Sequence, residues 1–212
     1  MINLNYEQSI LLLRERLKAA LPGSVAHQSM LHAYRYTPPV PPDDAKQSAV
    51  LLVLYPTAQN KTGLLLIERT KDGSPHSGQI ALPGGRYEEK DGDLQNTAIR
   101  ETFEEINLQP ENIEILGKIT PMYIPVSNFC VHPYIGICNS LNGLLASDDE
   151  VAQIIHTDLE TLFQQKGTVK IALVAAPNGV IKAPAYLLPN NKYIWGATAM
   201  IIAELEYILL NK

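Results

Sequence analysis

The chain has 212 residues, of which 46% are hydrophobic, so it can bury one substantial core, whereas two independent domains would be small. Its formal net charge of −5 argues against a broad nucleic-acid or membrane interface, because both surfaces are anionic and attract clustered Lys and Arg. The net charge does not exclude small anionic ligands, since a local basic site can lie on an acidic protein. No stretch approaches the roughly 20 apolar residues of a membrane span. The N-terminal apolar run, residues 10–13, is too short for a signal peptide, so we expect a cytoplasmic protein.

The N-terminal part of the chain is predicted to be separate from the main domain. Residues 6–20 carry apolar side chains at helical spacing, with Asn5 as a suitable N-cap, which predicts a helix. Residues 37–46 read TPPVPPDDAK, and this proline content favours an extended or irregular segment. We therefore expect an N-terminal helical and proline-rich extension at 1–45 and a main domain at 46–212.

The main domain begins with a strand, strand, loop, helix order. Residues 49–55 and 64–67 are short apolar runs separated by a polar turn, which is typical of neighbouring buried strands. Residues 78–92 contain four glycines and a proline, which predicts a loop shaped by backbone requirements. Residues 94–106 are good helix formers without proline, and Asp93 is placed to cap them.

The second half of the domain mixes strands with helices. Further strands are predicted at 113–119, 131–138, 169–174 and 185–188, and residues 195–210 read as a closing helix. Residues 150–163 fit a helical stripe, yet 154–156 could equally be a short strand. Cys130 and Cys138 have no Cys or His partners at metal-ligand spacing and are expected to be buried reduced thiols. The pattern indicates an α/β or α+β sandwich.

Three carboxylates on the helix at 94–106 form a candidate metal site. Glu101, Glu104 and Glu105 stand at i, i+3 and i+4, which places them on one helical face. Their mutual repulsion is relieved by a divalent cation, because carboxylate oxygens suit hard ions such as Mg²⁺ or Mn²⁺. A solvated acidic face is the alternative. The tight turn Leu82-Pro83-Gly84-Gly85 in front of the helix favours the site, since its backbone can approach a ligand closely.

The turn and helix together carry a long motif. Residues 85–108 resemble the Nudix box, which reads Gly, five residues, Glu, seven residues, then Arg-Glu-apolar-x-Glu-Glu-x-Gly-apolar. The departures are Asp91 for the first Glu, eight rather than seven residues before Arg100, Thr102 in the first apolar position and Asn107 for the final Gly. Asn tolerates the left-handed conformation that a helix-ending Gly supplies.

The resemblance implies a fold, a cofactor and site residues. It implies a Nudix-type α/β/α sandwich with a mixed sheet, and Mg²⁺ or Mn²⁺ as the cofactor. The implied metal ligands are the Gly85 carbonyl oxygen, Glu101, Glu104 and Glu105. Arg100 would pair with Asp91 or Glu88. Glu101 or Glu150 would act as the general base that takes a proton from water attacking phosphorus.

Segments on both sides of this motif point to a substrate. Residues 65–70 and 76–85 are similar to the signature of the coenzyme A pyrophosphatase branch of the Nudix family, and 194–199 also look like that branch. The matching positions are Arg69, Gly78, Pro83, Gly84 and Gly85, and the departures are Ile67, Thr70, Ser74 and Leu82. Ser74 replaces an arginine suited to phosphate recognition, for which Lys71 or Arg35 could substitute.

The substrate that follows is a coenzyme A-like nucleotide, cleaved to 3′,5′-ADP and 4′-phosphopantetheine. The residues predicted to bind it are Arg69, His76, Gly78, Gln79, Gly84 and Gly85. Three residues also have a purely structural interpretation: His76 as a loop cap, Arg69 as a surface ion-pair partner and Trp195 as a core residue. Alternative functions are a pyrophosphatase for ADP-ribose, NADH or a nucleoside triphosphate, and a non-catalytic nucleotide-binding regulator. The N-terminal helix and the proline-rich stretch could dock on the core or on a second subunit, so a homodimer is a further alternative.

Overall fold

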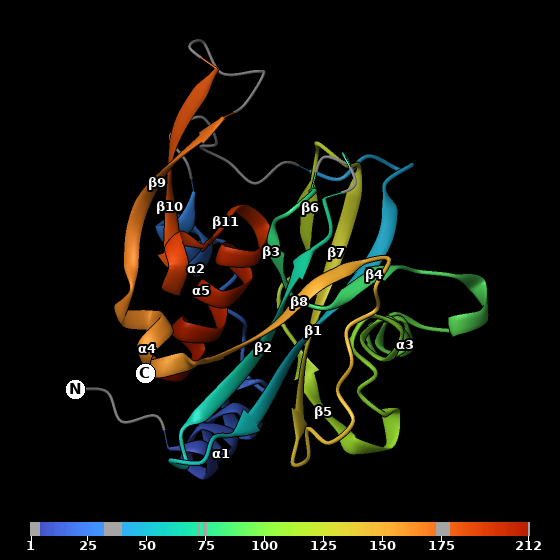
Figure 1. Ribbon diagram of the computed structural model, residues 1–212, viewed down its shortest axis with the longest axis vertical. Coiled ribbons are helices and arrows are strands. Elements are labelled where there is room, and N and C mark those ends of the chain that lie inside the picture. Colours follow the sequence, from blue (N-terminus) through green and yellow to red (C-terminus); the bar gives the residue numbers. More distant parts are fainter. Residues whose placement is uncertain (1–4, 32–39, 72, 74–75, 173–178, 212) are drawn as a thin grey trace.

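The computed structural model describes residues 5–31, 40–71, 73, 76–172 and 179–211. A large mixed sheet has the strand order β3-β2-β1-β7-β5, with β8 paired to β2, β4 to β1 and β6 to β7. A second, three-stranded sheet has the order β11-β10-β9. Figure 1 shows α3 on one side of the large sheet, with α5 and the second sheet on the other.

The helices and strands have the following bounds. The helices are α1 Tyr6–Arg16, α2 Ser24–His27, α3 Leu94–Ile106, α4 Leu159–Gln164 and α5 Gly196–Leu210. The strands are β1 Lys46–Pro56, β2 Thr62–Arg69, β3 Ile80–Ala81, β4 Gly84–Arg86, β5 Ile113–Lys118, β6 Met122–Ile124, β7 Phe129–Cys138, β8 Val151–Asp158, β9 Lys166–Ala172, β10 Val180–Leu187 and β11 Tyr193–Trp195. Short 3-10 turns include η2 at Glu89–Asp91 and η3 at Pro110–Asn112.

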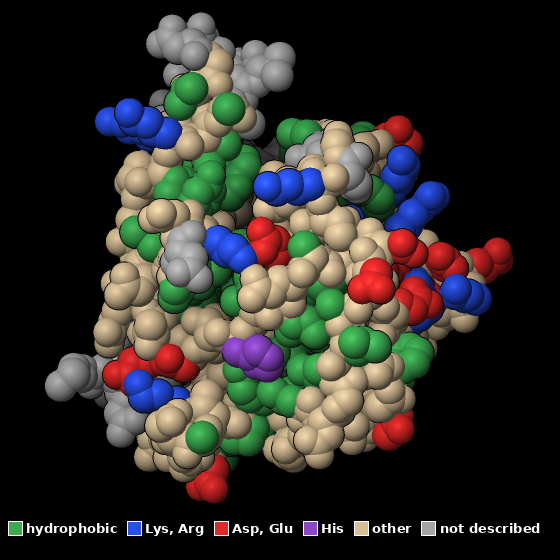
Figure 2. Space-filling model, in the orientation of Figure 1, with side chains coloured by type: hydrophobic (Ala, Val, Ile, Leu, Met, Phe, Trp, Pro, Cys, Tyr) green, Lys and Arg blue, Asp and Glu red, His purple; other side chains and the backbone are tan. Residues whose placement is uncertain are grey.

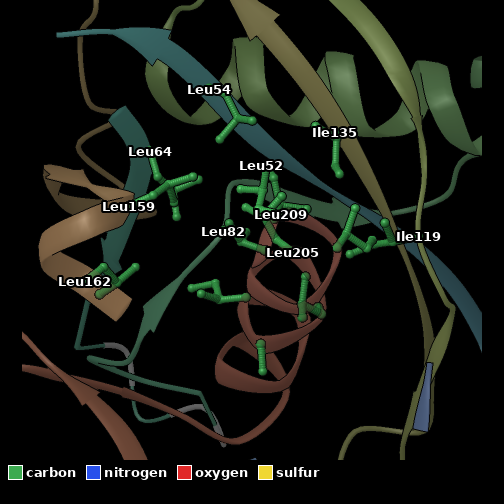
Figure 3. Packing of buried hydrophobic residues seen from close by; sticks show 14 of the residues in the cluster. Leu52, Leu54, Leu64, Leu82, Ile119, Ile135, Leu159, Leu162, Leu205 and Leu209 are labelled. Atoms are coloured by element: carbon green, nitrogen blue, oxygen red, sulfur yellow. The ribbon is translucent and has the colours of Figure 1, made fainter. Parts of the chain in front are cut away.

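β1 lies at the centre of the fold and is buried on both faces. It pairs in parallel with β7 and antiparallel with β2 and β4. Because successive side chains of a strand point to opposite faces, Leu52 and Leu54 pack toward α5 while Leu51 and Val53 pack toward α3. This explains why β1 reads as an unbroken apolar run rather than an alternating one. Figure 3 shows the larger of these two clusters, where α5 meets the sheet.

The N-terminal helix packs into that same larger cluster. Asn5 caps α1 as predicted, since its side chain accepts hydrogen bonds from the amides of the first turn. The helix ends at Arg16, four residues before the predicted end, while Leu13 of α1 is fully buried in the cluster shared with α5. In the proline-rich segment, residues 40–45 form neither helix nor strand, and 37–39 lie outside the described residues.

Several sequence predictions need correction. The segment 78–92 is not wholly a loop, because β3 pairs with β2 and β4 pairs with β1 inside it. Residues 150–163 are neither one helix nor a brief strand: they form β8, which pairs with β2, and then α4, which Asp158 caps. The closing helix starts at Gly196, after the short strand β11. The last two residues of the strand predicted at 169–174 lie outside the described part of the chain.

Two further features bear on the predicted class of protein. Cys130 and Cys138 are both free thiols, and Cys138 is buried as expected, whereas Cys130 is only half-buried. Within the described residues, no helix is long and apolar enough to cross a membrane. The predicted mixed α/β sandwich is confirmed by the arrangement of helices around the sheet.

Candidate active site

The helix α3 has the bounds and caps that its sequence predicted. Asp93 Oδ1 accepts a hydrogen bond from the Asn96 amide at 2.7 Å, and Asn107 ends the helix in the left-handed conformation with φ 55°. Thr102, which takes an apolar position of the motif, is fully buried, and its hydroxyl donates to the Ala98 carbonyl at 2.7 Å. Two of the departures from the motif, Thr102 and Asn107, are therefore accommodated within the helix itself.

The glycine turn brings the backbone of β4 against this helix. The Gly84 amide donates to Glu105 Oε2 at 2.8 Å. A Cβ on Gly84 would overlap the Ala49 carbonyl of β1, and one on Gly85 would overlap the Glu101 carboxylate. Gly84 therefore allows a close approach to the rigid backbone of the neighbouring strand, and Gly85 allows a close approach to the flexible Glu101 side chain.

Glu105 is the most deeply buried acid of the site. Its side chain is 1% exposed, and among the described residues its Oε1 atom has no hydrogen-bond partner. Burial raises the pKa of Glu105 to about 8, assisted by the charges of Glu101 and Glu150 and opposed by the Gly84 amide and Arg69. A buried carboxylate oxygen without a donor is costly, which marks this atom as a candidate ligand for a cation.

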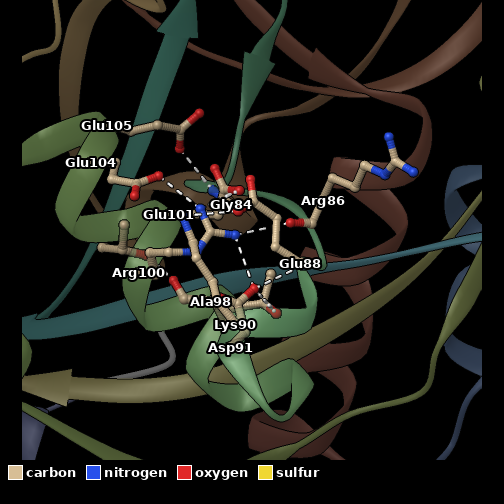
Figure 4. A network of polar contacts seen from close by, with 12 residues as sticks. Gly84, Arg86, Glu88, Lys90, Asp91, Ala98, Arg100, Glu101, Glu104 and Glu105 are labelled. Atoms are coloured by element: carbon tan, nitrogen blue, oxygen red, sulfur yellow. Dashed lines mark hydrogen bonds and ion pairs between the residues drawn. The ribbon is translucent and has the colours of Figure 1, made fainter.

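Arg100 organises the remaining acids (Figure 4). Its guanidinium binds both carboxylate oxygens of Asp91, at 2.6 and 3.0 Å, and also contacts Glu101 at 2.9 Å and Glu104 at 2.7 Å. The pairing with Asp91 was one of the two predicted; Glu88 pairs with Lys90 instead. The Arg100 guanidinium holds the pKa of Asp91 well below its ordinary value.

The predicted trio of glutamates does not converge on one point. In the described residues, no group of three or more His, Cys, Asp or Glu side chains is arranged to hold a metal ion. Glu101 and Glu105 lie at the glycine turn, whereas Glu104 is 49% exposed and is drawn toward Arg100. Without a cation to offset their repulsion, carboxylates on one face separate and take the nearest positive partner.

The donor set nevertheless fits a hard divalent ion. It consists of carboxylate oxygens and a backbone carbonyl, the groups that Mg²⁺ and Mn²⁺ prefer. Glu105 Oε1 accepts no hydrogen bond among the described residues, and Glu101 packs closely on Gly85, so two acids face the same turn. Acidic side chains also gather on the surface over the β4–η2 turn and α3, at the right of Figure 2.

Glu150, one of the two predicted general bases, lies on a loop that is hydrogen-bonded to α3. The Ser147 amide donates to the Glu105 carbonyl at 2.9 Å, and the Thr70 amide donates to the Glu150 carbonyl at 3.0 Å. Glu150 is exposed, and its charge raises the pKa of both Glu101 and Glu105. Its side chain thus belongs electrostatically to the same site.

Arg69 stands between the carboxylate helix and the predicted substrate residues. A register shift in the pairing of β2 with β8 falls between Glu68 and Arg69, and such bulges re-aim side chains. The Arg69 guanidinium lies 3.7 Å from Glu105 Oε1, so its ion-pair partner is a residue of the site. The loop after β2 folds back on the strand, since the Arg69 amide donates to the Gln79 carbonyl at 3.0 Å.

Three other predicted substrate residues lie beside a cavity. His76 Nδ1 is 3.4 Å from Gln79 Oε1, which is the local hydrogen-bonding role weighed for this residue. Gly78 and Gln79 line a cavity of about 380 Å³ together with Trp195, which is half-buried rather than a core residue. Ser74 lies outside the described residues, as does Arg35. The sequence predictions overlooked Glu68, Lys192 and Tyr193, which line the same cavity.

A second cavity, of about 430 Å³, surrounds Tyr55 and His156. The Tyr55 hydroxyl lies 3.1 Å from His156 Nδ1, and its ring covers Gly63. None of the predicted site residues is among the described residues that line this cavity, and Lys192 is shared by both cavities. Gly78 and Gln79 of the signature segments thus line the smaller cavity, and no described residue of α3 lines either cavity.

Comparison with known proteins decides the family. The family model described as the NUDIX domain matches residues 45–172, more than half of the chain. This chain belongs to the Nudix family. It is 32% identical over 168 residues to the uncharacterized Nudix hydrolase NudL of Pectobacterium atrosepticum, a match that covers 78% of this chain and 83% of the relative. A Citrobacter koseri NudL is 31% identical over 160 residues, covering 76% and 81%.

The solved structures agree on the Nudix fold. A Nudix hydrolase from Alicyclobacillus acidocaldarius superposes with a TM-score of 0.51 at 15% sequence identity, covering 78% of this chain and 91% of that one. The family match and the NudL relatives show that the chain is a Nudix hydrolase, an enzyme class that acts on pyrophosphate bonds and generally uses divalent metal ions.

The burial of Glu105 predicts a stability that depends on both pH and metal. In the metal-free fold its pKa is about 8 against an ordinary 4.5, so unfolding releases a proton between these values. Stability of the metal-free Nudix hydrolase should therefore fall as pH rises through this window. An ion that binds the charged carboxylate should reverse the loss, so Mg²⁺ should raise the melting temperature more at about pH 8.5 than at about pH 6.

Thermal unfolding with and without Mg²⁺ at the two pH values measures this linkage. Glu105→Gln cannot titrate at this position, so the variant should flatten the metal-free pH dependence. An equal metal-induced shift at both pH values in the unmodified chain would show that Glu105 does not exchange its proton for the ion.

Proposed function

We propose that this Nudix hydrolase cleaves the pyrophosphate bond of coenzyme A or a close derivative. Water adds to one phosphorus and the bridging P–O bond breaks, giving 3′,5′-ADP and 4′-phosphopantetheine. The observation that carries the proposal is the contact of Arg69, from the coenzyme A pyrophosphatase-like signature, with Glu105 of the carboxylate helix, at 3.7 Å. An arginine of the substrate signature thus forms an ion pair with a glutamate of the hydrolytic motif.

The proposal assigns roles to the residues of the site. Glu101, Glu104, Glu105 and the Gly85 carbonyl would hold the ion, Mg²⁺ or Mn²⁺. When bound, such an ion offsets the charge of the phosphates and lowers the pKa of attacking water. Arg100 holds Glu101 and Glu104 in place through its own anchor on Asp91.

The remaining groups act on the substrate and the proton. Arg69 would bind the pyrophosphate, since its guanidinium fits phosphate oxygens. Glu101 or Glu150 would accept the proton of water, and burial raises the pKa of Glu101, which favours proton acceptance near neutral pH. The two acids differ in exposure, so the pH profiles of Glu101→Gln and Glu150→Gln distinguish them: only loss of the base should remove the acidic limb.

The deciding experiment is hydrolysis of coenzyme A with and without Mg²⁺ or Mn²⁺, followed by identification of the products. We expect metal-dependent release of 3′,5′-ADP and 4′-phosphopantetheine, with a kcat/KM at least about tenfold above that for ADP-ribose, NADH and nucleoside triphosphates. Preferred cleavage of one of those nucleotides would reject the coenzyme A proposal and keep the Nudix chemistry. Binding of nucleotides without turnover of any would favour the regulator alternative.

A further inference from the structure

Two segments that are far apart in the chain form one cavity beside the site. Gly78 and Gln79 come from the loop after β2, and Tyr193 and Trp195 form the strand β11 of the second sheet. The cavity of about 380 Å³ falls within the range of small-molecule pockets, about 300–1,000 Å³. A ligand of the size of a nucleoside therefore fits between the two sheets.

The wall formed by the second sheet is apolar and aromatic. Tyr193 and Trp195 are half-buried and pack against Ile171, Ile181 and Ala183, which anchor them to β9 and β10. Hydrophobic side chains gather on this sheet at the upper left of Figure 2. Aromatic side chains held in this way offer flat faces on which a planar ring can stack.

An acid and a lysine that line the cavity neutralise each other: Glu68 comes from β2, and Lys192 directly precedes β11. Lys192 Nζ donates to Glu68 Oε2 at 2.6 Å and to Gln153 Oε1 at 2.7 Å. An ammonium group has three N–H donors, so the third donor of Lys192 can bind a ligand. The Glu68 carboxylate can accept further hydrogen bonds. A paired acid and lysine do not select an anion: they offer a hydrogen-bond donor beside an acceptor.

This cavity and the carboxylate helix lie at the same end of β2. Glu68 lines the cavity, and the next residue, Arg69, contacts Glu105. Neighbouring strand residues point to opposite faces, so one substrate could reach both places only by passing the edge of the sheet at β3 and its loop. The pyrophosphate would lie on one side of that edge and another part of the substrate on the other.

We propose that the cavity binds the aminopurine ring of the substrate, an inference that rests on the proposed function. The ring stacks on Trp195 and Tyr193. Its exocyclic amino group donates to Glu68, and a ring nitrogen accepts from Lys192, a pairing that reads the donor and acceptor edge of adenine. Coenzyme A, ADP-ribose and NADH all carry this ring, and pantetheine does not.

Trp195 is the single tryptophan of the chain, so its emission reports on the cavity directly. Titration with AMP in the presence of EDTA, which removes any contribution of divalent metal, should change Trp195 fluorescence in a saturable way. IMP differs at the position of the exocyclic amino group and should bind about tenfold more weakly, since it presents an oxygen to the Glu68 carboxylate. Free N-acetyltryptophanamide corrects for absorption by the nucleotides.

Variants test each wall of the cavity. Glu68→Gln offers an amide donor as well as an acceptor, so it should narrow or reverse the preference for AMP over IMP. Glu160→Gln is the matched control, because Glu160 also pairs with a lysine, Lys61, at 3.1 Å but does not line this cavity. Trp195→Leu should raise KM for the cleaved nucleotide about tenfold with kcat little changed, and Trp195→Phe should restore it.

The outcomes separate this inference from the proposed function. An AMP response without hydrolysis of coenzyme A would reject that substrate and support the aminopurine site. Hydrolysis of coenzyme A with no response to AMP up to millimolar concentration would overturn the aminopurine site and leave the reaction standing. A response to pantetheine in place of AMP would also overturn it, by assigning the aromatic wall to the other half of the substrate.

Discussion

Glu104→Gln should reduce metal-dependent hydrolysis about a thousandfold, because loss of one ligand charge removes several kcal/mol of stabilisation from the reacting phosphates. The fold should not change measurably. The Glu104 side chain is 49% exposed, and a Gln in its place can still accept the hydrogen bond from Arg100. Unfolding free energy should therefore differ from that of the unmodified chain by less than about 1 kcal/mol. Steady-state rates at saturating Mg²⁺ and thermal unfolding measure the two effects.

Glu15→Gln provides the control for this prediction. Glu15 is an exposed acid on α1, outside the carboxylate site, so removal of its charge should leave the rate unchanged. Turnover of Glu104→Gln at the level of this control would mean that Glu104 belongs only to the ion-pair network of Arg100. The metal site would then contain only two of the three glutamates, Glu101 and Glu105, which face the glycine turn.

Gly85→Ala should lower kcat about a hundredfold while the protein stays folded. The added methyl group would occupy the space of the Glu101 carboxylate, the end of a flexible side chain that can move away. Displacement of a catalytic group by about 1 Å is enough for a loss of this size. Kinetics at saturating Mg²⁺, with circular dichroism as the folding check, measure the outcome.

The neighbouring glycines supply two controls of opposite kind. Gly84→Ala places its methyl group against the rigid Ala49 carbonyl and requires φ 146°, so it should destabilise the fold itself, by about 1–3 kcal/mol or more. In Gly92→Ala the added methyl group meets no atom within 4 Å, so only the φ of 73° is unfavourable. The substitution should lower the unfolding free energy by about 1–2 kcal/mol and leave kcat unchanged. Full activity in Gly85→Ala would show that Glu101 does not need its place on the turn.

Local signals were sufficient to predict the helix that carries the three glutamates. Asp93 and Asn107 define the ends of α3 through their own side-chain and backbone preferences, which do not depend on the rest of the fold. The spacing of Glu101, Glu104 and Glu105 likewise follows from helical geometry. Of the two predicted partners of Arg100, Asp91 was correct and Glu88 was not, since Glu88 pairs with Lys90.

Features that depend on distant partners could not be predicted in this way. β3 and β4 are strands only because β2 and β1 offer free edges to them, so their glycine-rich sequence indicated a loop. β8 resembles a helix in periodicity and becomes a strand by pairing with β2. Lys192 is a surface lysine in the sequence, and its place in two cavities follows from the packing of the second sheet.

The link between Asp91 and Arg100 spans the segment that holds the added residue of the Nudix motif. This segment contains the 3-10 turn η2 and Gly92, around which a Cβ would meet no atom within 4 Å. The Arg100 guanidinium joins this segment to the helix through both carboxylate oxygens of Asp91, and Thr97 and Asn96 of the helix also donate to Asp91, at 2.8 and 3.0 Å. The helix thus holds a carboxylate from a segment of unusual length, so the arginine that opens the glutamate run keeps an acidic partner despite the added residue.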